Sequence, residues 1–187
     1  MTVYVFDRTA GEAWHDAFAS LQSSRSILEP RGDRGTRDDT HQIYQADLAK
    51  VKTAIDKLPK DLRTIGMFLY GPEQSDKLTN ETASVVWNKY MEGRGRDFVE
   101  SFHKTSSCII LCRASIEEAR FRLHGEEHYS QRMLANMLCT SQSTVQRKWS
   151  DIFETFVDIA EELGKDALTP IAIVCGDIHA EYLSCAA

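Results

Sequence analysis

The 187-residue sequence has no apolar run that approaches the roughly 20 residues needed to cross a bilayer. Its first residues lack a basic segment followed by a long apolar core, so we expect no secretory signal. It also lacks the glycine-rich loops that bind phosphate and the G-x-S-x-G turn that carries a nucleophilic serine. We therefore expect a cytoplasmic protein that is not an enzyme, needs no cofactor and has no membrane partner.

The cysteines are irregularly placed along the chain. The five cysteines form an odd set without framework spacing, which favours free thiols over disulfides. Cys108 and Cys112 lie in an apolar run, and we expect two buried thiols on one helical face. A zinc site stays open as the alternative, although no second cysteine pair completes four ligands. The stretch from His124 to His128 matches H-x-x-E-H, but Gly125 interrupts it, and a linker between helices is expected.

The charge is unevenly distributed along the chain, whose net charge is −6. Residues 113–150 carry six basic and four acidic side chains, a net charge of +2, whereas residues 151–187 carry one basic and eight acidic, a net charge of −7. Residues 1–112 are nearly balanced, with 15 basic and 16 acidic side chains. An acidic face cannot lie against phosphates, but it can meet a basic protein surface or simply be solvated.

Apolar periodicity and capping residues predict helices along most of the sequence. We expect helices from Thr9 or Gly11 to about Leu21, over 43–58, from Pro59 to a stop at Gly71-Pro72, from a cap at Thr79 or Asn80, over 98–102, and from Ser106 or Ser107 to Gly125. Residues 29–40 combine Pro, Gly and charge, which indicates a loop. Near the end, Gly164 is expected to close one helix, and Thr169-Pro170 to open another that runs to about Leu183. A strand over 171–175 is the alternative for that last segment.

The most informative segment runs from Tyr129 to Leu163. Ser130 can cap a short helix whose buried face would be Met133, Leu134, Met137 and Leu138. Cys139-Thr140-Ser141 would form the turn, and Ser141 would cap a second helix whose Val145 points back towards Ala135. A short helix, a tight turn and a second helix with polar and basic residues at its start are typical of the helix-turn-helix.

The outward side chains of this segment suit a DNA major groove. Glutamine can pair with adenine, arginine with guanine, and serine or threonine with bases or phosphates. The residues expected to contact DNA are Arg132, Ser141, Gln142, Ser143, Thr144, Gln146, Arg147 and Lys148. An ordinary helical hairpin with a solvated polar face is the alternative, because such patterns also arise by chance.

Residues from about Cys112 to Leu163 resemble the helix-turn-helix of bacterial and phage regulators and the promoter-reading domain of sigma factors. Together with Leu58-Pro59-Lys60-Asp61-Leu62-Arg63, Gly66 and Leu69-Tyr70-Gly71-Pro72, this layout looks like the Q-type late antiterminators of phages and their chromosomal relative AlpA. The resemblance covers much of residues 45–165. It implies double-stranded DNA and RNA polymerase holoenzyme, including its sigma factor, as partners, with DNA contacts at positions 141–148.

We thus predict an all-α protein, a multi-helix body with an integrated helix-turn-helix. The expected parts are an N-terminal helix and flexible loop (1–40), a helical body (41–112), the DNA-binding region (113–164) and a C-terminal helix (165–187). The predicted function is positive transcription regulation with RNA polymerase, by antitermination from a promoter-proximal DNA element. A dimeric promoter-binding repressor or activator, and a helical adaptor that binds only protein, are the alternatives.

Overall fold

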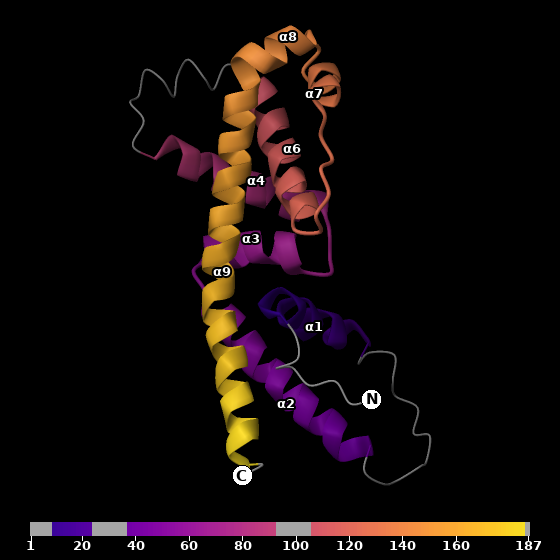
Figure 1. The fold of residues 1–187 in the computed structure, drawn as a ribbon, viewed down its shortest axis with the longest axis vertical. Helices are drawn as coiled ribbons and strands as arrows, with labels where there is room; N and C mark the ends of the chain where they lie inside the picture. The colour runs from indigo at the N-terminus through magenta and orange to yellow at the C-terminus, as the bar shows by residue number, and fades with distance from the viewer. Residues whose placement is uncertain (1–8, 24–36, 93–105, 186–187) are drawn as a thin grey trace. The chain divides into compact units, whose positions relative to one another are not determined.

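A computed structural model describes residues 9–23, 37–92 and 106–185, and the regular secondary structure of these residues is all helical, without strands (Figure 1). The helices are α1 (Ala10–Ser23), α2 (Arg37–Asp56), α3 (Lys60–Tyr70), α4 (Asp76–Met91), α6 (Ser106–Arg122), α7 (Gln131–Met137), α8 (Gln142–Thr144), a π-helical turn (Val145–Trp149) and α9 (Ser150–Cys185). This confirms the predicted all-α class for these residues. None of the helices described here combines the length and apolar character needed to span a membrane.

Local signals place most helix starts as predicted. The backbone amide of Thr9 donates to the Glu12 carboxylate (2.8 Å) and the Glu12 amide to the Thr9 hydroxyl (3.3 Å), a reciprocal cap on α1. Pro59 immediately precedes α3, which ends before Gly71. The prediction for α4 was wrong by one turn, because Ser75 rather than Thr79 or Asn80 accepts the cap bond, from Leu78 N. The predicted helix over 98–102 lies outside the described residues.

The loop predicted over 29–40 is corrected at its end, because α2 already begins at Arg37. Residues 29–36 lie outside the described part of the chain. The apolar side chains from Tyr44 onwards hold α2 in place, and the helix extends backwards because adding a residue to an existing helix costs little compared with nucleating one. Four polar residues, 37–40, therefore join the helix rather than the loop.

The largest correction concerns α9, which is one continuous helix through Gly164 and Pro170. The predicted stop at Gly164, the predicted start at Thr169-Pro170 and the alternative strand over 171–175 were all wrong. Proline removes one backbone donor from a helix, but packing can outweigh that loss. Ala167, Ile171 and Ile178 are buried in a shared hydrophobic core, and the Thr169 hydroxyl donates to the Lys165 carbonyl (3.0 Å), so the helix continues.

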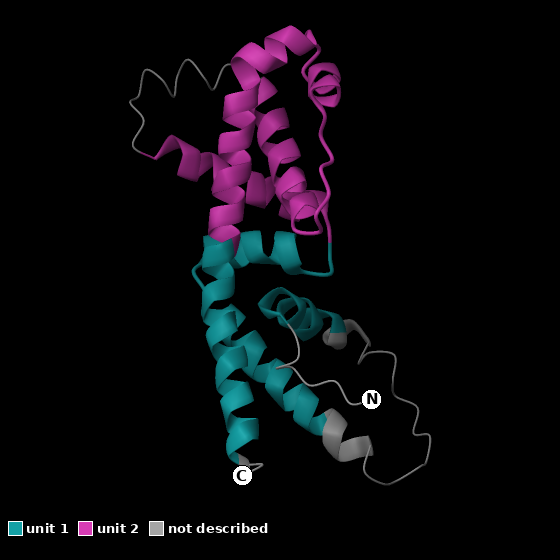
Figure 2. Cartoon of the chain, in the orientation of Figure 1, with its two compact units in different colours: residues 1–73, 165–187 teal, residues 74–164 magenta. Residues whose placement is uncertain are grey.

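The chain forms two compact units, residues 1–73 with 165–187 and residues 74–164 (Figure 2). In the first unit, α1, α2 and the distal part of α9 enclose the core residues Ala13, Trp14, Ala17, Leu48, Val51, Ile55, Ala167, Ile171 and Ile178. Gly66 of α3 lies so close to the indole of Trp14 that an added Cβ would come within 2.3 Å of the ring. Two tyrosine hydroxyls, of Tyr44 and Tyr182, donate to the carboxylates of Asp16 and Asp47.

The second unit packs α4, α6, α7, the π-helical turn and the proximal part of α9. Phe156 of α9 meets Tyr90 of α4 edge to face, with ring centroids 4.7 Å apart, and Trp87 lies 6.1 Å from the same ring. From α6, the Cys112 thiol donates to the Ala83 carbonyl of α4 over 3.2 Å. Aromatic pairs of this kind contribute beyond the area they bury, so α4 and α9 are firmly joined within this unit.

Candidate nucleic-acid interface

The α7 helix begins and ends at residues that the sequence singled out. The Ser130 hydroxyl accepts the amide of Met133 over 3.3 Å, which confirms the predicted N-cap. Leu134 and Ala135 are buried, as a short helix crossing a second one requires. The predicted burial of the two methionines was wrong: Met133 and Met137 are each more than a third exposed, because a helix of seven residues can turn only a narrow face inwards.

The turn after α7 is closed by two backbone bonds. The amide of Thr140 donates to the carbonyl of Ala135 (2.9 Å), and the amide of Cys139 donates to that of Asn136 (3.2 Å). This is the Schellman pattern, whose middle residue adopts left-handed backbone angles and is usually glycine. Here that residue is Cys139, with φ of +50°.

The second helical segment starts at Ser141, whose hydroxyl accepts the amide of Thr144 (3.2 Å), as predicted. Val145 is fully buried, which matches its expected position at the helix crossing. The segment is not one regular α-helix: a π-helical turn spans Val145–Trp149, and the amide of Ser150 donates to the carbonyl of Val145. Single π turns inside helices are frequent at functional sites, because they change the direction of the side chains they contain.

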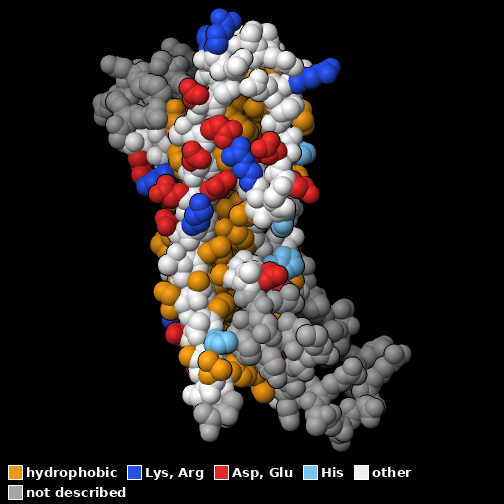
Figure 3. Space-filling model, viewed as in Figure 1, with side chains coloured by type: hydrophobic (Ala, Val, Ile, Leu, Met, Phe, Trp, Pro, Cys, Tyr) orange, Lys and Arg blue, Asp and Glu red, His pale blue; other side chains and the backbone are white. Residues whose placement is uncertain are grey.

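The eight predicted contact residues are accessible. Seven of them are exposed and Thr144 is partly exposed, so no described part of the chain covers them. Figure 3 shows Lys and Arg side chains projecting from the end of this unit that carries α7 and α8, with acidic side chains further along α9. Arg147 is partly ordered by its own helix, because its Nε donates to the Ser143 carbonyl (3.2 Å).

A buried carboxylate holds the segment that leads into α7. Glu118 of α6 is only 2% exposed, and its Oε2 accepts the backbone amides of His128 (3.0 Å) and Tyr129 (2.9 Å). Its Oε1 accepts Nε of Arg122 (3.1 Å), and the other end of that guanidinium reaches Glu154 of α9 (3.0 Å). Sequence reasoning missed this network, although a glutamate on the buried face of a predicted helix was a visible signal.

The segment between α6 and α7 is also held by aromatic contacts. His128 stacks on Phe121 with centroids 4.2 Å apart, and the Tyr129 ring lies 6.4 Å from Phe153. The Tyr129 hydroxyl donates to Glu117, and burial together with that carboxylate raises the pKa of the tyrosine. A small pocket of about 290 Å³ opens beside this pair, lined by Ile110, Arg113, Ala114, Glu117, Tyr129 and Met137.

The structure also bears on the two weaker motifs. Gly125 has φ of +75° at the end of α6, so His124 and His128 do not share a continuous helix, which a zincin requires. Cys108 and Cys112 are buried, as predicted, and burial raises the pKa of the Cys112 thiol to about 12. Among the described residues no group of three or more His, Cys, Asp or Glu side chains is arranged to hold a metal ion.

Comparison with known proteins finds no matching family model, no matching curated protein and no matching solved structure. Function is therefore inferred from the geometry of these residues. Three features bear on function: the exposed polar side chains of residues 130–149, which we call the tip, the serine caps of its helices, and the hydrogen-bond network around Glu118.

Proposed function

We propose that residues 130–149 form a helix-turn-helix that reads double-stranded DNA. The observation that carries the proposal is the separation of two sets of side chains on this segment. Leu134, Ala135 and Val145 are buried, while the polar and basic side chains predicted to contact DNA point outwards. Glutamine, arginine and lysine displayed together at the start of a helix are side chains that can pair with base edges and phosphates in a major groove.

The charge around the tip supports the same assignment. Arg132, Arg147 and Lys148 are exposed at the α7–α8 end of the unit. The acidic residues of α9 follow further along the helix, with Asp158 and Glu162 also exposed. A duplex approached by the tip would meet cations, and the acidic side chains would remain available to a basic protein surface.

We further propose that the protein is a positive transcription regulator that acts with RNA polymerase holoenzyme, as an antiterminator loaded at a promoter-proximal element. This step rests on the resemblance to Q-type antiterminators, carried by residues 58–72 and the reading segment. The exposed acidic side chains of α9, such as Asp158 and Glu162, are suited to contact a basic surface of a protein partner. A pull-down from cell extract scored for polymerase subunits, followed by terminator readthrough, tests this part; altered initiation without readthrough would favour a repressor or activator.

DNA reading itself is tested by selecting duplexes from a random pool with the wild-type chain and titrating the selected site. Arg147→Ala and Gln142→Ala should each lose about 1–3 kcal/mol of discrimination at one base position. Arg63→Ala, which removes the same type of charge from a residue outside the helix-turn-helix segment, is the matched control and should bind normally. Equal binding by all these variants would contradict the assignment and leave a protein-binding adaptor as the better interpretation.

A further inference from the structure

We propose that Glu118 is a positioning residue for DNA reading: it sets the register of α7 against the second helical segment through the backbone of residues 128–129 and, by way of Arg122, through Glu154. The inference deepens the proposed DNA-reading function and rests on it. Glu118 does not contact DNA itself, because it is buried.

The bonds to Glu118 specify the path of the chain. A buried carboxylate is costly unless its oxygens are occupied by donors. Here two consecutive backbone amides occupy one oxygen and the Arg122 guanidinium the other. Because two of the three donors belong to the backbone, Glu118 fixes where residues 128 and 129 lie, whatever their side chains. Charged acceptors form stronger and shorter bonds than neutral ones, so the position is well defined.

The cap of α7 follows directly from this anchored segment. The hydroxyl of Ser130, the next residue after Tyr129, accepts the amide of Met133 in the first turn of the helix. The stacking of His128 on Phe121 and the packing of Tyr129 against Phe153 hold the same two residues by their side chains. Because no residue separates Tyr129, which Glu118 holds, from the cap at Ser130, the position of the start of α7 is set by α6.

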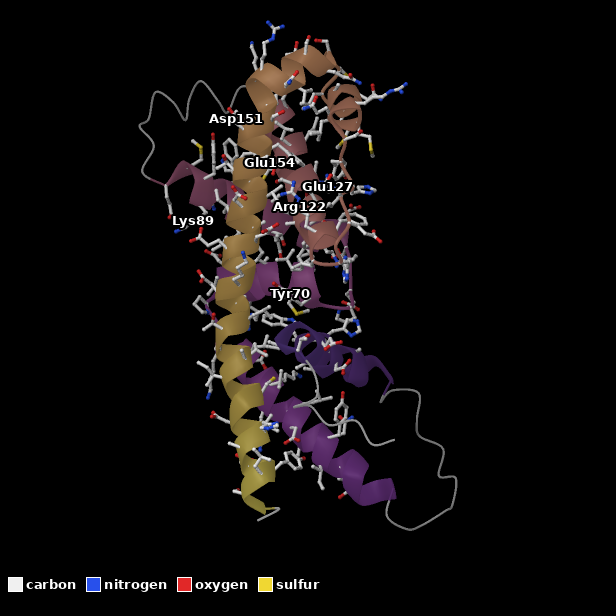
Figure 4. All side chains as sticks on the ribbon, in the orientation of Figure 1. Tyr70, Lys89, Arg122, Glu127, Asp151 and Glu154 are labelled. Carbon is white, nitrogen blue, oxygen red and sulfur yellow. The ribbon has the colours of Figure 1, made fainter. Side chains whose placement is uncertain are left out.

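Arg122 links Glu118 to the second helical segment. Its Nε binds Glu118 and its Nη2 binds Glu154, which lies on α9 seven residues after Arg147 (Figure 4). The guanidinium is planar and rigid, so the two carboxylates are held at a fixed separation. The start of α7 and the second helical segment are thus both positioned by Glu118 of α6. A shift of either segment would move Gln142 and Arg147 relative to α7.

The test compares Glu118→Gln and Arg122→Lys with Glu81→Gln, a control at an exposed position of α4 in the same unit. Glutamine keeps the size of the side chain but turns one acceptor into a donor that faces other donors. Lysine keeps the charge but cannot bridge two carboxylates with a rigid fork. Each variant is measured, under conditions where circular dichroism shows it folded, for amide hydrogen exchange at residues 128–129 and for affinity towards the selected duplex and a scrambled duplex.

We call the bonds from Glu118 and Arg122 to residues 128, 129 and Glu154 the clamp. For Glu118→Gln and Arg122→Lys we expect faster exchange of these two amides and a roughly tenfold loss of affinity for the selected duplex, which is the loss expected when one base contact is misplaced. Affinity for the scrambled duplex should change little, because phosphate contacts tolerate small shifts. A clamp that serves stability alone would lower the unfolding midpoint and leave the ratio of the two affinities unchanged; that result would overturn the inference. If Glu118→Gln does not fold, Arg122→Lys decides, since Arg122 is partly exposed.

The exchange measurement separates this inference from the proposed function. Faster exchange with an unchanged affinity ratio would reject positioning by Glu118 while DNA reading stands. If the wild-type chain selects no duplex at all, DNA reading fails and the positioning role falls with it, although the amides of residues 128–129 would still report on the clamp.

Discussion

The amide of Thr140 donates to the carbonyl of Ala135, and the bond spans Cys139, a residue with left-handed backbone angles. For an L-residue other than glycine that conformation is disfavoured, because Cβ crowds the following carbonyl oxygen. The end of α7 therefore keeps its geometry at a local cost, which the two closing backbone bonds offset.

Substitution Cys139→Gly should stabilise the protein by about 0.5–1 kcal/mol, because glycine adopts positive φ without strain but loses more entropy on folding. Cys139→Val should destabilise it, since a β-branched side chain tolerates this region least. Urea unfolding of the three proteins measures both effects. A loss of stability on introducing glycine would show that the cysteine side chain has a role beyond backbone geometry.

A second prediction concerns the close approach of α3 to α1. In Gly66→Ala the new Cβ would lie 2.3 Å from the Trp14 ring, far inside contact distance, so the indole or the helix must shift. Overpacking of this kind costs about 1–3 kcal/mol. Thermal unfolding should show a lower midpoint, and an unchanged midpoint would mean that α3 can move away from Trp14 at no cost.

The matched control is Gly176→Ala in the distal part of α9. Apart from the adjoining residues and backbone of α9 itself, no atom in the described chain lies within 4 Å of an added Cβ there, and the position is exposed inside a helix. Alanine should therefore stabilise the protein by about 1 kcal/mol through helix propensity alone. The two glycine substitutions should thus change the unfolding midpoint in opposite directions, and a decrease in both would contradict the assignment of residue 176 to a continuous helix.

The buried Cys112 thiol predicts an alkaline loss of stability. Burial raises its pKa in the folded protein to about 12, above the value of about 8.5 expected in the unfolded chain. The folded state thus holds the proton more tightly, and the associated stability is complete below about pH 8.5 and is lost as the pH rises towards 12. Between pH 8 and 10 the free energy of unfolding should fall by about 1–2 kcal/mol from this group.

Cys112→Ser, which removes the ionisation and can still donate to the Ala83 carbonyl, should flatten this part of the pH profile. Urea unfolding at several pH values in that interval measures the slope. The interval ends at pH 10 because Tyr129, whose pKa is also raised, contributes a loss of the same sign at higher pH. Equal slopes for the wild type and Cys112→Ser would rule the thiol out as the source.

The basic tip predicts a salt dependence. Lys148→Ala should reduce the slope of log affinity against log salt by about 1 for any duplex, because one fewer counterion is released when a phosphate contact is lost. Lys77→Ala, which changes an exposed side chain of α4, should leave the slope unchanged. Titrations at several salt concentrations, with selected and scrambled duplexes, measure this; an identical slope for both lysine variants would place Lys148 away from the phosphates.

Sequence signals predicted those parts of the fold that depend on neighbours in the chain. Caps at Ser130 and Ser141 and the buried Ala135 and Val145 follow from short-range hydrogen bonding and helical spacing. Gly164 and Pro170 misled the prediction because their intrinsic preference for helix ends is overcome by tertiary packing of Ala167, Ile171 and Ile178. Side-chain burial elsewhere in the fold, not local sequence, decides such cases.

The candidate site likewise combines features that local sequence predicts with features that depend on tertiary contacts. Its exposed side chains could be named from residue type and spacing, whereas the network beneath it joins residues far apart in sequence, from Glu118 to Glu154. The π-helical turn was equally invisible, because the pattern of Val145, Trp149 and Phe153 fits a regular helix. Only the three-dimensional arrangement shows that α6 supports both helical segments.

The continuity of α9 has a consequence for how the protein is made. Core residues of α1 and α2, Trp14 and Val51 among them, meet Ala167, Ile171 and Ile178 in one core, yet these last three are translated after the entire second unit. The apolar surface of Trp14 and its neighbours therefore stays incompletely covered until the ribosome has synthesised residues 165–187, about the last eighth of the chain. Truncation near residue 164 would leave the earliest-synthesised helices without their final layer, and they would be the part most prone to aggregate.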